Sequence, residues 1–191
     1  MSAYSFAVFD TEIGPCAIVW SARGVAGVQL PEANERAKRA RVARRFAGAQ
    51  EAEPPPDVQR AVDGIVALLR GERSDFGDVA MDFGDLPEFN LKVYDIARAI
   101  PAGETMTYSE IAERLGDKLL ARDVGTALGQ NPIPLIMPCH RVLAADGKTG
   151  GFSASGGVVT KLRLLTIEGA EPGGPTLFER RPLMAVRRRR G

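Results

Sequence analysis

The chain has 191 residues, of which 45% are hydrophobic and 26% are charged, and its formal net charge is +1. These totals are typical of a globular protein and exclude a chain that binds nucleic acid through a high overall charge. Two cysteines and one histidine are too few for a disulfide framework or a Cys/His zinc site, so we expect no metal. No basic and apolar leader or membrane-length apolar run is evident, so we expect a cytoplasmic protein with no membrane partner.

Residues 1–84 have the pattern of a small α/β domain. Short apolar runs bounded by turn residues predict strands. These runs lie at 4–9, 17–20, 25–30 and 79–83. The segment 32–49 is rich in strong helix formers, and we expect Asp57 to cap a second helix that ends at Leu69. Cys16 lies at the edge of a predicted strand and is most simply a packing residue.

The predicted helix at 32–49 carries a basic cluster. Its members are Arg36, Lys38, Arg39, Arg41, Arg44 and Arg45. Such a cluster can contact phosphate, but a solvated helix face is the commoner explanation. We therefore expect these side chains to lie in solvent.

Residues 85–88 are predicted to link this domain to a mostly helical one at 89–169. An amphipathic helix is expected at 89–100, and Thr107 with Glu110 forms a capping box that opens a helix ending at Leu115. A second helix at 119–128 follows, so the pair is typical of a helix-turn-helix. By itself this pattern is weak evidence of DNA binding, because most such pairs are only structural.

A thiol and an imidazole stand side by side at Cys139 and His140, after an apolar run that contains three prolines. An imidazole can help a thiol to become a nucleophilic thiolate, although a buried packing cysteine is the alternative. We expect Cys139 to lie on a strand. A last helix is predicted at 159–168, with Leu162, Leu165 and Thr166 directed inward and Gly169 as its cap, before an Arg-rich tail at 170–191 that we expect to be mobile.

Pro138-Cys139-His140-Arg141-Val142 resembles the active-site signature of the O6-alkylguanine-DNA alkyltransferases, a family of methylated-DNA–protein-cysteine methyltransferases. The resemblance is strong over 89–169 and looser over 4–83. Further matches follow in family order and at nearly family spacing. They are Ile100-Pro101-Ala102-Gly103-Glu104-Thr105, Tyr108-Ser109, Arg122 with Val124-Gly125, Asn131-Pro132, Lys161 with Leu164-Leu165, and Glu168-Gly169.

The resemblance implies a small, ribonuclease H-like α/β domain followed by a mostly α, winged-helix-like domain with a helix-turn-helix. It also implies repair of double-stranded DNA by direct reversal. A flipped-out O6-alkylguanine, or O4-alkylthymine, would transfer its alkyl group to Cys139. The resulting thioether would be permanent, so each protein molecule would act once. We expect no cofactor and a monomer.

The family's catalytic roles fall on five residues of this chain. Cys139 would accept the alkyl group, and His140 would take the thiol proton through a water. Glu168 would orient and charge-stabilise the imidazole, and Asn131 would brace the turn that leads to the cysteine strand. Tyr108 would donate a proton to the guanine ring as the C–O bond breaks.

Other roles concern the nucleobase and the DNA. Main-chain groups at Cys139 and Val142, together with Phe152 and Ser153, would hold the base, and Lys161 and Arg141 would support the site. The predicted helix at 119–128 would contact DNA, and its small residues would allow a close approach. Arg122 on this helix would fill the space left by the extruded nucleotide. The DNA-binding residues implied are Arg122, Thr107, Gly125 and Ala127.

Two positions depart from the family pattern. The family usually has Tyr-Ser-Gly-Gly where this chain has the longer loop Phe152-Ser153-Ala154-Ser155-Gly156-Gly157, which leaves the range of accepted alkyl groups open. Asp123 follows Arg122, where a carboxylate facing phosphate is unfavourable unless it pairs with Arg122 or Lys118.

Two other functions stay open at this point. One is a helix-turn-helix protein that binds alkylated DNA without repairing it. The other is a cysteine hydrolase that uses Cys139, His140 and Glu168.

Overall fold

The computed structural model describes residues 4–145 and 148–170. Its first part is a four-stranded sheet in the order β3-β2-β1-β4, in which β1, β2 and β3 form an antiparallel meander and β4 runs parallel to β1. The strands are β1 (Ser5–Phe9), β2 (Cys16–Ser21), β3 (Gly24–Gln29) and β4 (Gln50–Glu51). The three apolar strands confirm the sequence prediction.

The expected fourth strand at 79–83 is wrong. Among the described residues, this segment makes only a single parallel bridge, between Met81 and Val25. The backbone of Val25 bonds to Ala80 and Asp82, and no longer ladder follows. The fourth strand of the sheet is instead β4, which pairs with β1 at the opposite edge. It was missed because both of its residues are polar and exposed, so no apolar pattern marks it.

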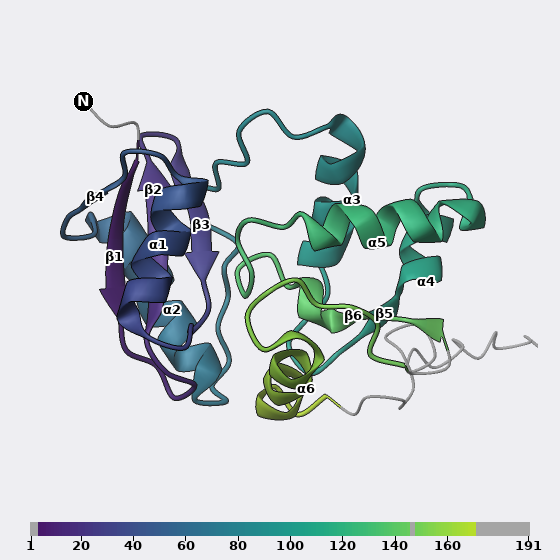
Figure 1. Cartoon of the computed structure of the whole chain (residues 1–191). Helices are drawn as coiled ribbons and strands as arrows, with labels where there is room; N and C mark the ends of the chain where they lie inside the picture. Colours follow the sequence, from purple (N-terminus) through teal and green to yellow (C-terminus); the bar gives the residue numbers. More distant parts are fainter. Residues whose placement is uncertain (1–3, 146–147, 171–191) are drawn as a thin grey trace, which may run out of the picture.

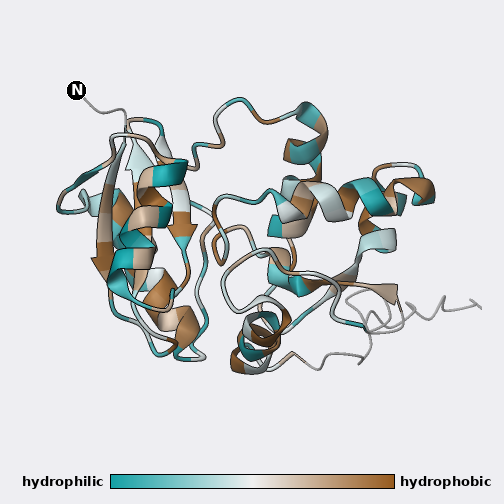
Figure 2. Ribbon diagram, in the orientation of Figure 1, coloured by the Kyte–Doolittle hydropathy of each residue, from teal (hydrophilic) through white to brown (hydrophobic). Residues whose placement is uncertain are grey.

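Two helices cover the sheet, and Figure 1 shows α1 in front of it and α2 behind. Ala17 and Val19 of β2 cluster with Val42 of α1 (Glu35–Arg45), whereas Ile18 and Trp20 face α2 (Pro56–Leu69). This division follows from the alternation of side chains along a strand. Figure 2 shows hydrophilic and hydrophobic residues side by side on α1, as expected of a helix with one face on a sheet.

The predicted cap of α2 is wrong by two residues. Pro55 is the N-cap and makes no side-chain cap bond, and Asp57 lies within the first turn. Proline is suited to a helix start because its φ is preset and it has no N–H to satisfy. Asp57 still favours the helix there through its negative charge near the N-terminus.

Two of the six basic residues of α1 pair with acids. Arg39 contacts Glu35 and Glu51, and Arg41 contacts Glu32 at 3.0 Å. Lys38 contradicts the prediction of a solvated face, because it is 1% exposed. Cys16 is fully buried in the core, as predicted.

The second part is mostly helical and contains the helix-turn-helix. Thr107 and Glu110 cap α4 through two reciprocal hydrogen bonds, as predicted. The predicted helix at 119–128 is a 3-10 turn followed by an α-helix. The elements are α3 (Glu88–Arg98), β5 (Met106–Thr107), α4 (Tyr108–Arg114), η1 (Lys118–Leu120), α5 (Ala121–Gly129), η2 (Cys139–Arg141), β6 (Val142–Leu143) and α6 (Gly157–Ile167).

Cys139 lies on the 3-10 turn η2 and not on the expected strand. Prolines at 134 and 138 cannot donate to a strand ladder, and Leu135 between them has a φ of 76°. The inward face of α6 is also corrected. Leu162 is 36% exposed and Thr166 is exposed, whereas Lys161, Leu164 and Leu165 are buried.

The segment before the cysteine is anchored in the core of the first part. Ile133, Leu135 and Ile136, with Leu164 of α6, pack in the same cluster as the apolar residues of β2, β3 and α2. The sheet therefore helps to fix the chain that leads into Cys139. No helix within 4–145 and 148–170 is long and apolar enough to span a membrane. Residues 171–191 of the predicted Arg-rich tail lie outside the described residues.

Candidate active site

Cys139 lies at a cavity of about 510 Å³ between α4, α5 and the loop that follows β6. This volume falls within the range of small-molecule sites. The thiol side chain is mostly buried, with 8% of the residue exposed. The cavity is lined by Tyr108, Ala121, Arg122, Gly125, Leu128, Gly129, Cys139, Gly151, Phe152 and Ser153.

Asn131 connects the end of α5 to the thiol. Its Nδ2 donates to Sγ of Cys139 at 3.2 Å and to the carbonyl of Met137 at 2.8 Å, and its Oδ1 accepts from the backbone N–H of Ile133 at 2.9 Å. Burial raises the pKa of the Cys139 thiol above its usual value, although the Asn131 bond and the charge of Lys161 act to lower it. The resting side chain is therefore a thiol, and it needs a base to react.

His140 does not line this cavity and belongs instead to a buried network. Its Nε2 lies 2.9 Å from Oε1 of Glu168, and it is fully buried. Arg141 donates to both oxygens of the same carboxylate, at 2.9 and 2.8 Å, and to the carbonyl of Ile100 at 2.6 Å. Nδ1 of His140 is buried and makes no hydrogen bond to the part of the protein that the structure describes.

The pKa values of this network follow from burial and charge. Burial lowers the pKa of His140, although Glu168 acts to raise it, so the imidazole is neutral at neutral pH. Burial alone would raise the pKa of Glu168. The charge of His140, which is protonated at low pH, the charge of Arg141 and the hydrogen bonds of both residues outweigh this effect and hold the pKa at about 2. The result is an ionised carboxylate beside a neutral imidazole.

Lys161 of α6 connects two segments of the chain near the cavity, one at Val142 and one at Gly151. The side chain is fully buried, and Nζ donates to the carbonyls of Val142 at 2.5 Å and Gly151 at 3.5 Å. Nζ also lies 5.7 Å from the ring centroid of Tyr108. Burial lowers the pKa of Lys161 to about 8, partly opposed by Cys139.

Tyr108 opens α4 and forms one wall of the cavity. Burial, and then the charge of a Cys139 thiolate, raise the pKa of its phenol. Gly150 packs against this ring: its φ is +65°, and a Cβ there would lie 2.8 Å from the Tyr108 oxygen. The sequence alone does not reveal this close approach, because it depends on contacts between segments distant in the chain.

The structure brings some of the expected contact residues to the cavity and leaves others outside it. Arg122, Gly125, Phe152 and Ser153 line it, together with Cys139 and Tyr108.

Three of the expected contact residues do not line the cavity. Val142 is fully buried beside it, and Thr107 caps α4. Ala127 is 1% exposed and accepts a hydrogen bond from Tyr94, so its burial does not support the predicted contact with DNA.

Asp123 is exposed on α5. One suggested partner, Lys118, contacts Glu113 instead. The other suggested pair, with Arg122, is not formed among the described residues.

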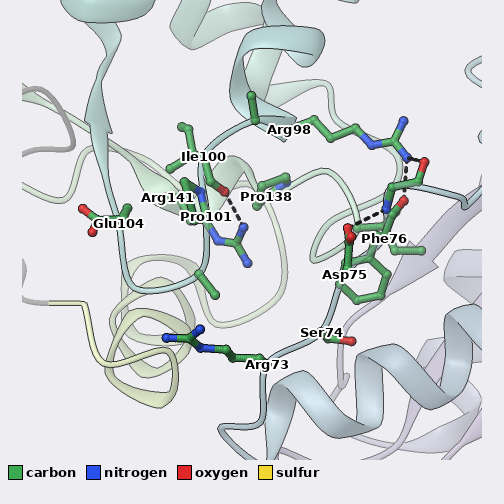
Figure 3. Close-up of a pocket in the computed structure, with 14 residues that line it drawn as sticks. Arg73, Ser74, Asp75, Phe76, Arg98, Ile100, Pro101, Glu104, Pro138 and Arg141 are labelled. Carbon is green, nitrogen blue, oxygen red and sulfur yellow. Dashed lines mark hydrogen bonds between the residues drawn. The ribbon is translucent and has the colours of Figure 1, made fainter. Parts of the chain in front are cut away.

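A larger cavity, of about 700 Å³, lies beside the segment 136–141 that carries Cys139 (Figure 3). Arg141 and Pro138 line it, but Cys139 does not. Arg98 is held there by the carbonyls of Phe76 and Gly77, at 2.5 and 2.8 Å. Its lining contains no thiol or imidazole, so we place the chemistry at the smaller cavity. The described residues hold no cluster of His, Cys, Asp and Glu suited to a metal ion.

Comparison with known proteins agrees with this geometry. Residues 88–170 match the family model described as "6-O-methylguanine DNA methyltransferase, DNA binding domain". The methylated-DNA–protein-cysteine methyltransferase of Methanothermobacter thermautotrophicus is 36% identical over 157 residues, which cover 82% of this chain and 81% of that protein. A protein of Thermus thermophilus named "DNA base-flipping protein" is 40% identical over 111 residues, 58% of this chain and 73% of the relative.

A solved structure is also similar. The crystal structure of Mycobacterium tuberculosis OGT in complex with DNA superposes with a TM-score of 0.70 at 33% identity, and the match covers 86% of this chain and 92% of that one. These similarities extend over both parts of the fold and not only over the Pro-Cys-His-Arg-Val motif. The chain therefore belongs to the family of the methylated-DNA–protein-cysteine methyltransferases.

Proposed function

We propose that this protein repairs DNA by direct reversal, through transfer of an alkyl group from O6 of guanine to Sγ of Cys139. The observation that carries the proposal is a buried thiol at a base-sized cavity whose lining includes Arg122 of the helix-turn-helix. In the reaction the O6–alkyl carbon bond breaks and an S–C bond forms. The thiol loses one proton and the released guanine gains one, so the atoms balance without a cofactor.

His140 is proposed to take the thiol proton. Glu168 is ionised and already accepts hydrogen bonds from Arg141, so Nε2 of His140 must carry a proton to bond with it. That tautomer leaves the lone pair on Nδ1, which is free to accept a proton through a water. Glu168 thus fixes the orientation of the imidazole and stabilises its protonated form.

The remaining site residues are proposed to hold the base. Tyr108 would donate a proton to the guanine ring, and Phe152, Ser153 and the main chain of Cys139 and Val142 would bind its edges. Lys161 supports this arrangement by holding the carbonyls of Val142 and Gly151 in place.

Arg122 is proposed to fill the gap in the duplex. Extruding a base costs a few kcal/mol, less for a poorly paired lesion. A guanidinium that enters the stack offsets part of this cost. Gly125 also lines the cavity, and its lack of a side chain would leave room for the nucleotide.

The test is a single-turnover reaction between the intact protein and a duplex that contains O6-methylguanine. We expect the protein mass to rise by one methyl group in place of a proton, on Cys139, with the Cys139→Ala variant unchanged. The relative named as a base-flipping protein supports a second candidate, a protein that binds the lesion without transfer. Tight binding of the duplex with no gain in mass would establish that function instead.

Several finer features are proposals of the same kind. We propose that O4-alkylthymine is a second substrate, that the protein is a cytoplasmic monomer, and that 85–88 separates domains at 1–84 and 89–169. The first would be ribonuclease H-like and the second winged-helix-like. The sheet with helices on both faces and the helix-turn-helix at α4 and α5 support these assignments.

A further inference from the structure

Leu119 is an exposed apolar residue on the surface proposed to meet DNA. It is 86% exposed, more than any other large apolar side chain in the described residues. It belongs to η1, in the turn between α4 and α5, which projects from the molecule at the right of Figure 1. A single exposed leucine is common on protein surfaces, but this one belongs to the same helix-turn-helix as Arg122, which lines the Cys139 cavity.

The turn holds Leu119 in a fixed position. Asp117 caps it, with Oδ1 accepting from the N–H of Leu119 at 2.8 Å and the main-chain carbonyl accepting from Leu120 at 3.2 Å. The N–H of Asp117 in turn donates to Ala112 of α4 at 3.1 Å, and Lys118 contacts Glu113. The exposed side chain is thus presented from a braced backbone.

Leu119 precedes Arg122 by three residues, so the two side chains lie on neighbouring turns of the same helical side. Arg122 lines the Cys139 cavity and Leu119 does not, so Leu119 would meet the DNA outside the cavity. Proteins that open or kink DNA from the minor groove often insert a leucine or another apolar side chain between base pairs.

The charges around this turn favour an apolar contact over a purely ionic one. Asp117 and Asp123 flank the segment, and Lys118 already contacts Glu113. Phosphate contacts normally dominate affinity for DNA, and carboxylates here oppose them. Burial of Leu119 among bases would supply attraction that does not depend on charge.

We propose that Leu119 inserts between base pairs next to Arg122 and stabilises the opened duplex. This inference rests on the proposed function, because it assumes that α5 faces the lesion. It assigns Leu119 a positioning role: the side chain would act on the DNA stack and leave the chemistry of the cavity unchanged.

Binding of a fluorescent duplex containing O6-methylguanine tests the proposal independently of transfer, in the Cys139→Ala background. We expect Leu119→Ala to weaken binding about tenfold, with an unchanged slope of log affinity against log salt. Val159→Ala, at a site on α6 that is 76% exposed, is the matched control and should bind normally. Equal affinity of the Leu119→Ala and Val159→Ala variants would overturn the proposal.

Two further measurements separate insertion from other roles. Leu119→Met should restore binding, and full restoration by Leu119→Lys with a steeper salt slope would instead show a phosphate contact and overturn the proposal. With Cys139 present, Leu119→Ala should slow transfer from the duplex but not from free O6-benzylguanine. Equal slowing with both substrates would show an effect on the cavity and would also overturn the proposal.

Absence of transfer in the unmodified protein would contradict the proposed function, whereas the binding comparison would still test Leu119.

Discussion

Oε1 of Glu168 lies 2.9 Å from Nε2 of His140, and the same carboxylate accepts two hydrogen bonds from Arg141. One buried acid thus joins the last helix to the turn that carries the thiol. The carboxylate stays charged because its pKa is about 2. It therefore sets the imidazole tautomer and also contributes to stability in a pH-dependent manner.

Glu168→Gln should lower stability at neutral pH and reduce its dependence on pH. The folded-state pKa of Glu168 lies below the usual 4.5, so its contribution is complete above pH 4.5 and is lost as the pH falls toward 2. This pKa shift corresponds to a stabilisation on the order of 3 kcal/mol. Urea unfolding between pH 2 and 7 should show the gap between the two proteins closing at low pH. Glu53→Gln, at an exposed residue, should change stability by less than about 0.5 kcal/mol.

The rate of alkyl transfer should stay constant as the pH falls from neutral to 6.5 and should decline only below pH 6.5. The proposed base is neutral His140, and burial lowers the pKa of His140 below its usual 6.5. Protonation therefore removes the base only in more acidic solution. Single-turnover rates with a methylated duplex across this range provide the measurement. A rate already halved at pH 6.5 would contradict the assignment.

Asn131→Ala should destabilise the protein and make the Cys139 thiol harder to ionise. The change removes three hydrogen bonds in a buried site, a loss of about 3 kcal/mol. The bond to Sγ also acts to lower the thiol pKa, so that pKa should rise further. Urea unfolding and the pH dependence of iodoacetamide labelling test the two effects. Asn90→Ala, which removes a partly buried hydrogen bond to Gln130, should affect only the stability.

Arg122→Ala should slow transfer from a methylated duplex by at least about tenfold and leave transfer from free O6-benzylguanine nearly unchanged. Only the duplex requires a group to fill the space of the extruded base. The salt slope of DNA binding should also decrease by up to about one, for one lost cation. Arg36→Ala, at an exposed residue of α1, is the control. Equal loss with both substrates would show that Arg122 acts on the cavity itself.

Asp123→Ala should strengthen binding to DNA by a few-fold at low salt. Asp123 is exposed on α5 beside Arg122, where a carboxylate repels phosphate. The gain should fade as salt is raised, since exposed charges are screened. Binding titrations at two salt concentrations measure the effect, with Asp95→Ala on α3 as the control. Unchanged or weaker binding would indicate that Asp123 faces away from the duplex.

The sequence by itself determined the features that depend on near neighbours. Short apolar runs bounded by turn residues specified β1, β2 and β3, and the reciprocal pair Thr107 and Glu110 specified the start of α4. The motif around Cys139, with its spaced matches, was enough to indicate the family. In each case the signal lies within a few residues or in a recurring motif, so no knowledge of packing was needed.

Only the tertiary structure decided how the site is arranged. Cys139 and His140 are adjacent in sequence, but the 3-10 turn directs one to the cavity and the other to Glu168, 28 residues away. The inward face of α6 was mispredicted because burial of Lys161 depends on carbonyls of Val142 and Gly151, which local periodicity does not show. Side-chain direction and burial are set by contacts between distant segments, and these form only when the chain has folded.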